Sequence, residues 1–596
     1  MTIRRLICAG LLLAPLLPAQ ENLFIQTPNA THPKDKTRIE VESLFSMAPP
    51  TGYLPLRVTV VNQRKNDGRL RLRCLSESGV DPQDSAMESE FSIESTAGTA
   101  KTTDLLVPLT TRFDSSGYEG LSVQVLMSGS FGGNNGSLSC NFHPDGPAIL
   151  MSEPLFTPNS SALDAQLNST RSGGYGSYTF AARFTPSKLP EDWRAYSGYD
   201  VIMLTDDDWG GMPPGARAAV LQWIRLGGVA SIYRRASTSF GTLGIETQEA
   251  GNSTTYGLGT IELLNQSGST PTGLDAKKTV NRYHTSRGGL TIDALSESIS
   301  DDYSSGWALQ DEFGKQKFDY LIFIIVLIAF GVLVGPVNLF VFAKSGMRHK
   351  LFITTPVISI ATSVLLIALI LMRDGTGGRG ARIALIEVRP ESGENRAYVV
   401  QEQVSRTGVL LGSSFKIDED SAITPVPIAN SAWARLTPGV GGAGMRFTGN
   451  FTEGGMEISG DWFQSRSEQG QLIRAVVPTR GRIELKGAGG APTFVSTYDF
   501  PVERLYYADR SNGYWMVRDL EAGKATTGTP ISEAEYRSAV GDESRRLARR
   551  QREQLNRVSK RADHYVAVAT EAPAIETFDA INWVDTRTIL TGPVLR

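Results

Sequence analysis

YLIFIIVLIAFGVLVGPVNLFVFA occupies residues 320–343, and LFITTPVISIATSVLLIALILM occupies residues 351–372. Neither stretch contains a charged side chain. An α-helix rises about 1.5 Å per residue, so about 20 apolar residues cross the ~30 Å hydrocarbon core of a bilayer. Only residues 344–350 join the two stretches, which is too short a segment for a domain. The sequence therefore predicts two transmembrane helices that pair as a hairpin.

Three residues interrupt the first predicted span: Gly335, Pro336 and Asn338. Proline lacks a backbone N–H and kinks helices, so Pro336 is expected to distort this one. Asn338 could mark a transport or coupling site, or it could make a hydrogen bond to the second helix. The hydrogen bond is the favoured interpretation, because neither span holds a carboxylate that could carry protons or ions.

The first residues have the pattern of a secretory signal peptide, predicted over residues 1–19. Arg4 and Arg5 precede an apolar run over residues 6–17, and Ala19 provides a small residue for cleavage. An uncleaved anchor is the alternative, but this run is shorter than a membrane span requires. The chain before the hairpin is therefore expected to be exported.

The charges around the hairpin do not decide its orientation alone. Lys344, Arg348 and Lys350 favour a cytoplasmic loop, but basic residues also flank the outer ends of both spans. The predicted signal peptide resolves this ambiguity. It places residues 344–350 in the cytoplasm and both large soluble regions outside it.

Composition excludes several classes of protein for this chain of 596 residues. The formal net charge is −3, 20% of the residues are charged, and the mean hydropathy is −0.15. These values do not fit a disordered chain, a polybasic nucleic-acid-binding protein or a many-span transporter. No nucleic-acid partner is predicted.

Residues 20–146 alternate between apolar and polar side chains with the period of a β-strand. YLPLRVTVV over residues 53–61 is one example, and Asn66-Asp67-Gly68 is typical of the turns between such runs. The region is predicted to be an antiparallel β-sandwich. Cys74 and Cys140 are the only cysteines after the predicted cleavage site, so a disulfide is expected, with two buried free thiols as the alternative.

Residues 147–305 change to alternating strands and helices. A buried strand over residues 200–204 is followed by a helix that Pro213 and Pro214 open and Gly227 closes, and VASIY continues as the next strand. Strands joined through a helix by short connections predict a parallel α/β layer.

YDVIMLTDDD, ARAAVLQWIRLGGVASIY and YGLGTIELL together resemble the class I glutamine amidotransferase-like domain of exported bacterial membrane proteins. GPVNLFVFAKSGMRHKLFITTPVIS resembles the spanning segment of the same group, so the resemblance covers residues 147–372. It implies a flavodoxin-like α/β fold. Active relatives use a Cys nucleophile with a downstream His and Glu. This chain has no Cys after Cys140, and His284 is the only His in the layer, so the glutaminase reaction is not expected.

Candidate ligand-binding residues follow the strands of this layer. Asp206, Asp207 and Asp208 lie where α/β folds place ligands, so they could hold Mg²⁺ or Ca²⁺, although helix capping at a solvated loop tip is the favoured role. Arg234 and Arg235 could bind an anion, although such pairs more often face solvent. No zinc-protease helix, serine elbow or P-loop occurs, and no cofactor is predicted.

The chain after the hairpin is predicted to form two units. Residues 380–525 are rich in strands and predict a second β-sandwich. Residues 530–596 predict one long helix over 530–562, with a capping box at Ser532 and Glu535, and two closing strands.

The predicted protein is thus a multidomain, two-pass protein of a bacterial inner membrane with both soluble regions in the periplasm. The expected function is a non-enzymatic scaffold or binding module of the cell envelope, whose partners are the lipid bilayer and an envelope protein. One alternative is an accessory subunit of an envelope transport or export complex. The other is a metal-dependent exported enzyme that uses Asp206 to Asp208.

Overall fold

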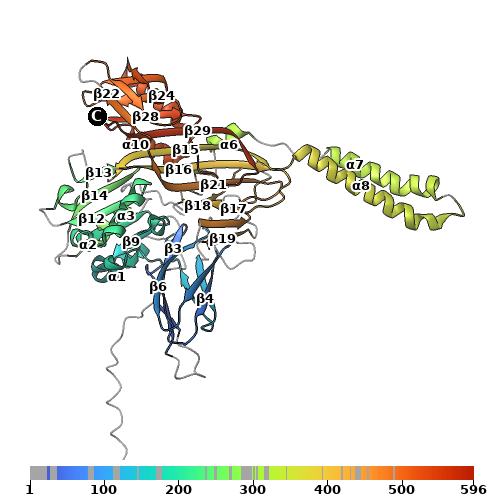
Figure 1. The fold of residues 1–596 in the computed structure, drawn as a ribbon, viewed down its shortest axis with the longest axis horizontal. Coiled ribbons are helices and arrows are strands. Elements are labelled where there is room, and N and C mark those ends of the chain that lie inside the picture. The colour runs from blue at the N-terminus through green and yellow to red at the C-terminus, as the bar shows by residue number, and fades with distance from the viewer. Residues whose placement is uncertain are drawn as a thin grey trace, which may run out of the picture.

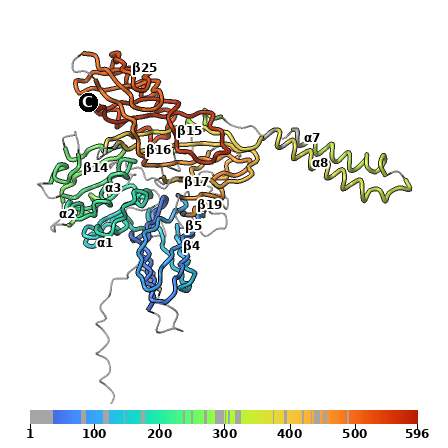
Figure 2. The backbone as a smooth tube through the Cα atoms, in the orientation of Figure 1, coloured from blue at the N-terminus to red at the C-terminus, as the bar shows by residue number. Residues whose placement is uncertain are grey.

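The structure is a computed structural model that carries side chains. It describes residues 23–595 except for 27–35, 78–85, 112–120, 144–145, 170–176, 235–237, 247–250, 267–271, 284–298, 300–301, 304–306, 315–320, 344, 392–393, 418–420, 430, 432, 437–444, 453–454 and 487–489. The predicted signal peptide lies outside the described residues. Figure 1 shows one large body from which a pair of helices projects. The tube in Figure 2 shows the chain leaving and re-entering that body at one place.

Two sheets form the part of the body that contains most of residues 20–146. The four-stranded sheet has the order β1-β2-β3-β6, and the seven-stranded sheet has the order β17-β20-β19-β5-β4-β7-β8. The strands before the hairpin are β1 (Leu23–Gln26), β2 (Arg38–Ser43), β3 (Tyr53–Val61), β4 (Gly68–Glu77), β5 (Ala86–Ser95), β6 (Ala100–Pro108), β7 (Ser122–Gly129) and β8 (Asn134–Ser139). The strands after the hairpin are β17 (Phe415–Ile417), β19 (Arg446–Thr452) and β20 (Gly455–Gly460). The antiparallel pairs predicted for residues 20–146 are present, but β19 extends their sheet by pairing in parallel with β5.

The predicted parallel α/β layer is also present. Its six-stranded sheet has the order β10-β9-β11-β12-β14-β13, and all neighbours are parallel except β13 and β14. The strands are β9 (Ile149–Ser152), β10 (Ala182–Phe184), β11 (Val201–Thr205), β12 (Val229–Arg234), β13 (Ser253–Tyr256) and β14 (Gly259–Asn265). The helices are α1 (Glu153–Ser169), η1 (Pro186–Lys188), η2 (Trp193–Tyr196), α2 (Asp206–Gly211), α3 (Pro214–Arg225), η3 (Gly241–Leu243) and α4 (Ala276–Tyr283). The helix predicted between Pro213 and Gly227 is α3, which begins at Pro214 as expected.

The projecting hairpin contains both predicted spans. It consists of α7 (Leu321–Val332), the π-helical η5 (Leu333–Phe342), the turn η6 (Arg348–Lys350) and α8 (Leu351–Asp374), and α6 (Ala308–Phe313) precedes it. Two helical stretches, Ile324–Phe342 and Arg348–Leu369, are long and apolar enough to cross a membrane. Only 6% and 0% of the residues in their apolar windows are buried, so neither is the core helix of the body.

After the hairpin the chain forms a mixed nine-stranded sheet with the order β18-β21-β16-β15-β29-β28-β24-β25-β27. Its strands are β15 (Gly378–Glu391), β16 (Glu394–Thr407), β18 (Ser421–Val426), β21 (Glu468–Thr479), β24 (Val502–Ala508), β25 (Tyr514–Leu520), β27 (Thr529–Ile531), β28 (His564–Ala569) and β29 (Ile581–Pro593). A three-stranded sheet contains β22 (Ile483–Lys486), β23 (Thr493–Ser496) and β26 (Ala525–Thr527). Two helices, α9 (Glu533–Ser544) and α10 (Arg549–Val558), complete this half.

The organisation predicted for residues 380–596 is wrong in two respects. Residues 380–525 do not form a self-contained second β-sandwich, because β17, β19 and β20 join the sheet of β5, while the predicted closing strands β28 and β29 insert beside β15. The helix predicted over 530–562 is two helices. The expected capping box of Ser532 and Glu535 opens α9, but the chain leaves the helix after Ser544 and buries Leu547 before α10 begins.

The predicted disulfide is also wrong, because Cys74 and Cys140 are both buried free thiols. Cys74 on β4 lies opposite Val125 of β7, whereas the N–H of Cys140 donates to the carbonyl of Leu121 at 2.8 Å, just before β7 begins. Leu121 and Val125 are four residues, or about 13 Å, apart along an extended strand. A disulfide needs Cα atoms within about 7 Å, so the strand register keeps the two thiols apart.

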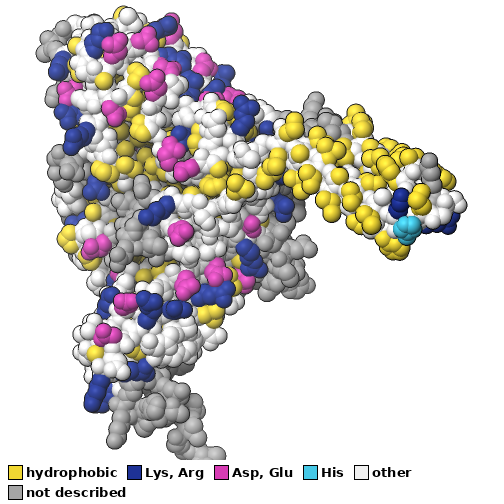
Figure 3. Space-filling view, turned by 45° about the vertical axis from the view of Figure 1, so that its right-hand side comes forward, with side chains coloured by type: hydrophobic (Ala, Val, Ile, Leu, Met, Phe, Trp, Pro, Cys, Tyr) yellow, Lys and Arg dark blue, Asp and Glu magenta, His cyan; other side chains and the backbone are white. Residues whose placement is uncertain are grey.

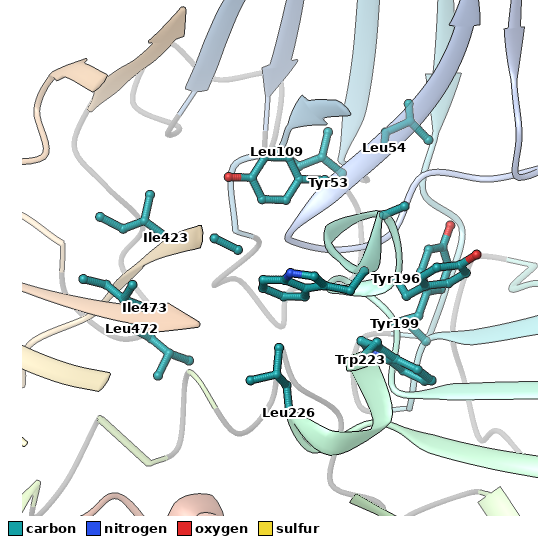
Figure 4. Packing of buried hydrophobic residues seen from close by; sticks show 14 of the residues in the cluster. Tyr53, Leu54, Leu109, Tyr196, Tyr199, Trp223, Leu226, Ile423, Leu472 and Ile473 are labelled. Atoms are coloured by element: carbon teal, nitrogen blue, oxygen red, sulfur yellow. The ribbon is translucent and has the colours of Figure 1, made fainter. Parts of the chain in front are cut away.

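One hydrophobic core connects the regions on both sides of the hairpin. Figure 4 shows this core where the N-terminal sheets, the α/β layer and the nine-stranded sheet meet. The residues that converge there are Tyr53, Leu54 and Leu109 from the first region, Tyr196, Tyr199, Trp223 and Leu226 from the second, and Ile423, Leu472 and Ile473 from the third. All are buried, so the chain before the hairpin and the chain after it share one interior.

Candidate functional site

Asp208, one of the predicted metal ligands, caps a helix instead. It follows β11, and its side chain accepts hydrogen bonds from Ser152 Oγ at 2.6 Å and from the N–H of Thr205 at 3.0 Å. The N–H of Asp208 in turn donates to Thr205 Oγ1 at 3.0 Å, which completes a capping box at the start of α2. The capping role is as predicted, but the carboxylate of Asp208 is buried and does not lie at a solvated loop tip.

The structure brings Asp206 and Arg234 together through Thr238. Thr238 Oγ1 donates to Asp206 Oδ2 at 2.5 Å, and the guanidinium of Arg234 donates to the carbonyl of Thr238. A second nitrogen of Arg234 donates to Asn252 Oδ1 at 2.8 Å. Both side chains therefore stabilise the loop that follows β12.

The structure describes only one of the remaining residues predicted in this layer. Asp207 is exposed, and Arg235 and His284 lie outside the described residues. Within the part of the chain that the structure describes, no three His, Cys, Asp or Glu side chains are grouped as a metal ion would require.

A second polar cluster, not predicted from the sequence, joins the α/β layer to the chain after the hairpin. Arg225 at the end of α3 donates to Tyr398 Oη of β16 and to Tyr256 Oη of β13, at 2.8 Å each. Burial raises the pKa of Tyr398 to about 12, so its hydroxyl remains protonated and can take part in these bonds. From the opposite side, Arg557 and Arg561 donate to the carbonyls of Leu258 and Gly257 at 3.4 and 3.2 Å.

Two glycines allow this close approach. Gly227 has a φ of +114°, and a Cβ there would lie 2.4 Å from Gln554 of α10. Gly257 has a φ of +66°, and a Cβ there would lie 2.7 Å from Glu387 Oε2 of β15. The two glycine turns of the α/β layer are therefore contact points for the other half of the molecule.

A buried acid connects the segment just before the hairpin to the nine-stranded sheet. Trp307, which precedes α6, donates its Nε1–H to Glu402 Oε2 at 2.9 Å, and the N–H of Ala548 donates to both carboxylate oxygens at 3.1 Å. Glu402 lies in the interior of β16, and burial raises the pKa of its carboxyl to about 8. A single side chain thus contacts both the approach to the hairpin and the start of α10.

The root of the hairpin contains a cleft of about 630 Å³. Its lining includes Gly375 to Gly378, which lead out of α8, together with Arg379, Arg406 and Trp433. Arg379 on β15 and Arg406 on β16 are directly opposed in the antiparallel register. Arg379 is one of the basic residues that flank the outer ends of the predicted spans, and nothing in the sequence indicates that β16 places a second arginine beside it.

Two carboxylates also line this cleft, and a third arginine binds both. Glu312 and Asp585 lie 2.8 and 3.3 Å from nitrogens of Arg546. Arg406 stacks on Phe313 with a separation of 4.8 Å and donates to the carbonyl of Gly314 at 2.6 Å. Arg379 is exposed and makes no ion pair within the part of the chain described here.

The predicted intramembrane residues also have defined positions. Asn338 is buried between the helices, and its Nδ2 donates to Thr355 Oγ1 of α8 at 2.9 Å, as the favoured interpretation predicted. Gly335 and Pro336 lie within η5, where the π-helical turn accommodates the proline. Arg348 and Lys350 are at the far tip of the hairpin, which carries the charged side chains of an otherwise hydrophobic surface (Figure 3). Lys344 lies outside the described residues.

No protein-family model and no curated protein matches this chain. One similar solved structure is a calcium-binding mutant of Bacteroides uniformis beta-glucuronidase 2, at 12% sequence identity and a TM-score of 0.14. The match covers 46% of this chain and 27% of that one, so this chain corresponds to about a quarter of the length of the other. A similarity of this size carries no argument about function.

Proposed function

We propose that this protein is a membrane-anchored scaffold or binding module of the bacterial cell envelope. In this proposal α7 with η5 and α8 cross the inner membrane as a hairpin. The loop at Arg348 to Lys350 faces the cytoplasm, and the whole body lies on the periplasmic side.

The pairing of β19 with β5 is the observation that carries this proposal. Arg446 to Asn450 lie after the hairpin and pair in register with Ala86 to Glu90, which lie before it. Strands of one sheet cannot lie on opposite sides of a bilayer, because no open sheet edge is stable within the hydrocarbon core. Two crossings return the chain to its starting side, as this shared sheet requires.

The proposed role as a scaffold rests on how the polar groups of the α/β layer are used. Asp208 bonds its own helix turn, Asp206 and Arg234 bond one loop, and Arg225 bonds the opposite half. Each of these groups therefore holds the body together. We propose that the layer has the amidotransferase-like fold that its sequence resembles, without the nucleophile of the active relatives.

Cysteine accessibility tests the topology. Lys101→Cys and Ala525→Cys lie at exposed positions on the two sides of the hairpin, and Gly346→Cys lies at its tip. On intact spheroplasts a membrane-impermeant maleimide should label the first two and should label Gly346→Cys only after detergent is added. Labelling of Gly346→Cys alone would show that the orientation is opposite to the proposed one. If only one of Lys101→Cys and Ala525→Cys were labelled, the two halves would lie on opposite sides of the membrane, which would contradict the proposal.

Thermal stability with metal tests the role of the acidic turn. The melting temperature of the full-length protein in detergent should not change with millimolar Mg²⁺ or Ca²⁺, and Asp206→Asn should respond as the wild type does. If metal raised the melting temperature of the wild type but not that of Asp206→Asn, the metal-dependent enzyme would be favoured. Co-purification with a multi-span protein in mild detergent would favour the transport-complex subunit.

A further inference from the structure

We propose that the root of the hairpin is a docking surface for an acidic phospholipid of the bilayer that holds the hairpin. Leu411 enters the interfacial layer, and Arg379 binds the lipid phosphate. This inference rests on the proposed function, because it requires that the hairpin spans a membrane.

Backbone hydrogen bonds fix the loop of Leu411 at the end of α8. Val409 N–H donates to the carbonyl of Gly375 at 3.0 Å, Gly377 N–H donates to Val409 at 3.1 Å, and Gly408 N–H donates to Gly377 at 2.8 Å. Gly375 directly follows α8 and is three residues, or about 5 Å, beyond Met372, where the apolar stretch ends. The loop therefore lies at the depth of the lipid headgroups.

The distribution of exposed hydrophobic side chains points to the same surface. Among the described residues, the large hydrophobic side chains that are exposed lie within the hairpin at positions 321–372, with two exceptions. These are Leu411, which is 98% exposed, and Val584, which is 50% exposed. Val584 lines the cleft at the root, and the loop of Leu411 is bonded to that root. A bilayer would cover both without a protein partner.

Leu411 and the residues around the cleft match the composition of a membrane interface. Leucine contributes apolar surface that is favourable when it is buried in the boundary between headgroups and acyl chains. Trp433, which also lines the cleft, belongs to the residue type that is enriched at this level of membrane proteins. The surface is therefore apolar where the hydrocarbon begins and basic just above it.

The charges in the cleft favour an anionic headgroup. Arg379 and Arg406 are opposed across neighbouring strands, and like charges in this position destabilise a sheet. Arg406 has Glu468 Oε2 at 3.4 Å, whereas Glu312 and Asp585 are held by Arg546. This leaves the exposed Arg379 as the side chain that a phosphate would neutralise, and a guanidinium can donate two hydrogen bonds to a phosphate.

A lipid-retention experiment tests the proposed role of Arg379. The full-length protein is reconstituted in nanodiscs that contain phosphatidylcholine with a minority of phosphatidylglycerol, and the phosphatidylglycerol retained per protein after detergent extraction is measured. Arg379→Gln should retain about fivefold less, which is the effect of one basic side chain at an anionic surface. Arg480→Gln is the matched control. Arg480 is exposed and directly follows the last residue of β21, whereas Glu468, which contacts Arg406 in the cleft, is the first residue of that strand. This variant should retain as much phosphatidylglycerol as the wild type.

A fluorescent probe tests the insertion of Leu411. Leu411→Cys and Ala525→Cys are labelled with an environment-sensitive dye under native conditions, where Cys74 and Cys140 are buried. In nanodiscs the emission from position 411 should shift to shorter wavelength and should be quenched by lipid-attached nitroxide. Emission from position 525 should do neither, because β26 belongs to the three-stranded sheet with β22, at the end of the body away from the hairpin (Figure 1).

The outcomes separate this inference from the proposed function. Loss of the wild-type protein from membranes in an alkaline carbonate wash would overturn both. Retention in the membrane, combined with unchanged emission at position 411 or equal lipid retention by Arg379→Gln, would overturn the docking surface alone. If inorganic phosphate at millimolar concentration removed the retained lipid while the protein stayed in the nanodisc, the cleft would be a general phosphate site, and the lipid assignment would be wrong.

Discussion

The six-stranded and seven-stranded sheets differ in where their strands come from. All strands of the six-stranded sheet lie between Ile149 and Asn265, on one side of the hairpin. The seven-stranded sheet combines four strands from before the hairpin with β17, β19 and β20 from after it. The first sheet therefore forms within one continuous segment of the chain, whereas the second exists only when the two halves of the chain meet.

This difference explains how the hairpin is tied to the body. The hairpin projects from the body at one place, and the body beside it is held together by strand pairing, apolar packing and buried polar contacts between the halves. Each kind of contact between the chain before the hairpin and the chain after it can be weakened separately by mutation.

Ile423→Ala is expected to have the largest effect, because it removes apolar contact between the halves. Ile423 of β18 and Tyr53 of β3 line one small void, and both belong to the shared core. Truncation of a buried isoleucine to alanine costs about 2–5 kcal/mol of unfolding free energy. Hydrogen exchange in mild detergent should show lower protection in both β18 and β3, although the substitution lies after the hairpin.

Leu505→Ala is the matched control. Leu505 of β24 is also buried but packs in a smaller cluster that contains only residues from after the hairpin. It should lower the protection of β24 and the strands beside it, β25 and β28, and leave the protection of β3 unchanged. If Ile423→Ala also left β3 unchanged, the two halves would not form one cooperative unit.

Much of the local structure is predictable from the sequence. The helix α3 has proline at its start and Gly227 just after its end, and the capping box at Ser532 and Glu535 opens α9 as expected. Asn338 is bonded to Thr355 because a polar side chain between apolar helices needs a partner. These features depend on residues a few positions apart in the sequence, or on one polar side chain that is unfavourable among apolar residues unless it forms a hydrogen bond. Their sequence signals are therefore local.

The long-range pairing is not predictable in this way. The alternating pattern of β19 would fit many partners, and no residue in it specifies β5. The burial of Glu402 is equally hidden, because an acidic residue in a strand usually faces solvent, and its donors Trp307 and Ala548 are distant in sequence. The capping role of Asp208 depends on local sequence, whereas the cleft at the root, which the sequence does not indicate, is lined by five separate segments of the chain.

Glu402→Gln tests the hydrogen bond between Trp307, before the hairpin, and Glu402, after it. The substitution should change how the free energy of unfolding depends on pH. The pKa of this carboxyl is about 8 in the folded protein and 4.5 in an ordinary environment. Between these values the folded state binds the additional proton, so wild-type stability falls as pH rises, by up to about 1.4 kcal/mol per pH unit. Glutamine does not titrate, so chemical denaturation between pH 5.5 and 7.5 should give the variant a shallower fall than the wild type.

Glu387→Gln is the control for this pH effect. Glu387 is also fully buried, and burial opposes its ionisation, but Arg389 and Arg561 hold the pKa of this carboxyl below its ordinary value. It is therefore charged throughout the same pH range in both states, and its replacement should lower stability without changing the slope. Parallel curves for Glu402→Gln and the wild type would contradict the assignment of the titrating group.

Asn338→Ala should have the smallest effect, because its one bridging hydrogen bond lies within the hairpin. The bond from Asn338 Nδ2 to Thr355 Oγ1 joins η5 to α8, and bonds of this kind contribute about 0.6 kcal/mol in membrane proteins. A double-mutant cycle with Thr355→Val, measured by unfolding in mixed micelles, should give a coupling energy of that size. Thr354→Val is the matched control, because Thr354 Oγ1 donates to Lys350 within the same helix end at 3.0 Å. Coupling of Asn338 to Thr354 in place of Thr355 would mean that the two helices pair differently from the structure, and coupling to neither would mean that apolar packing alone holds them together.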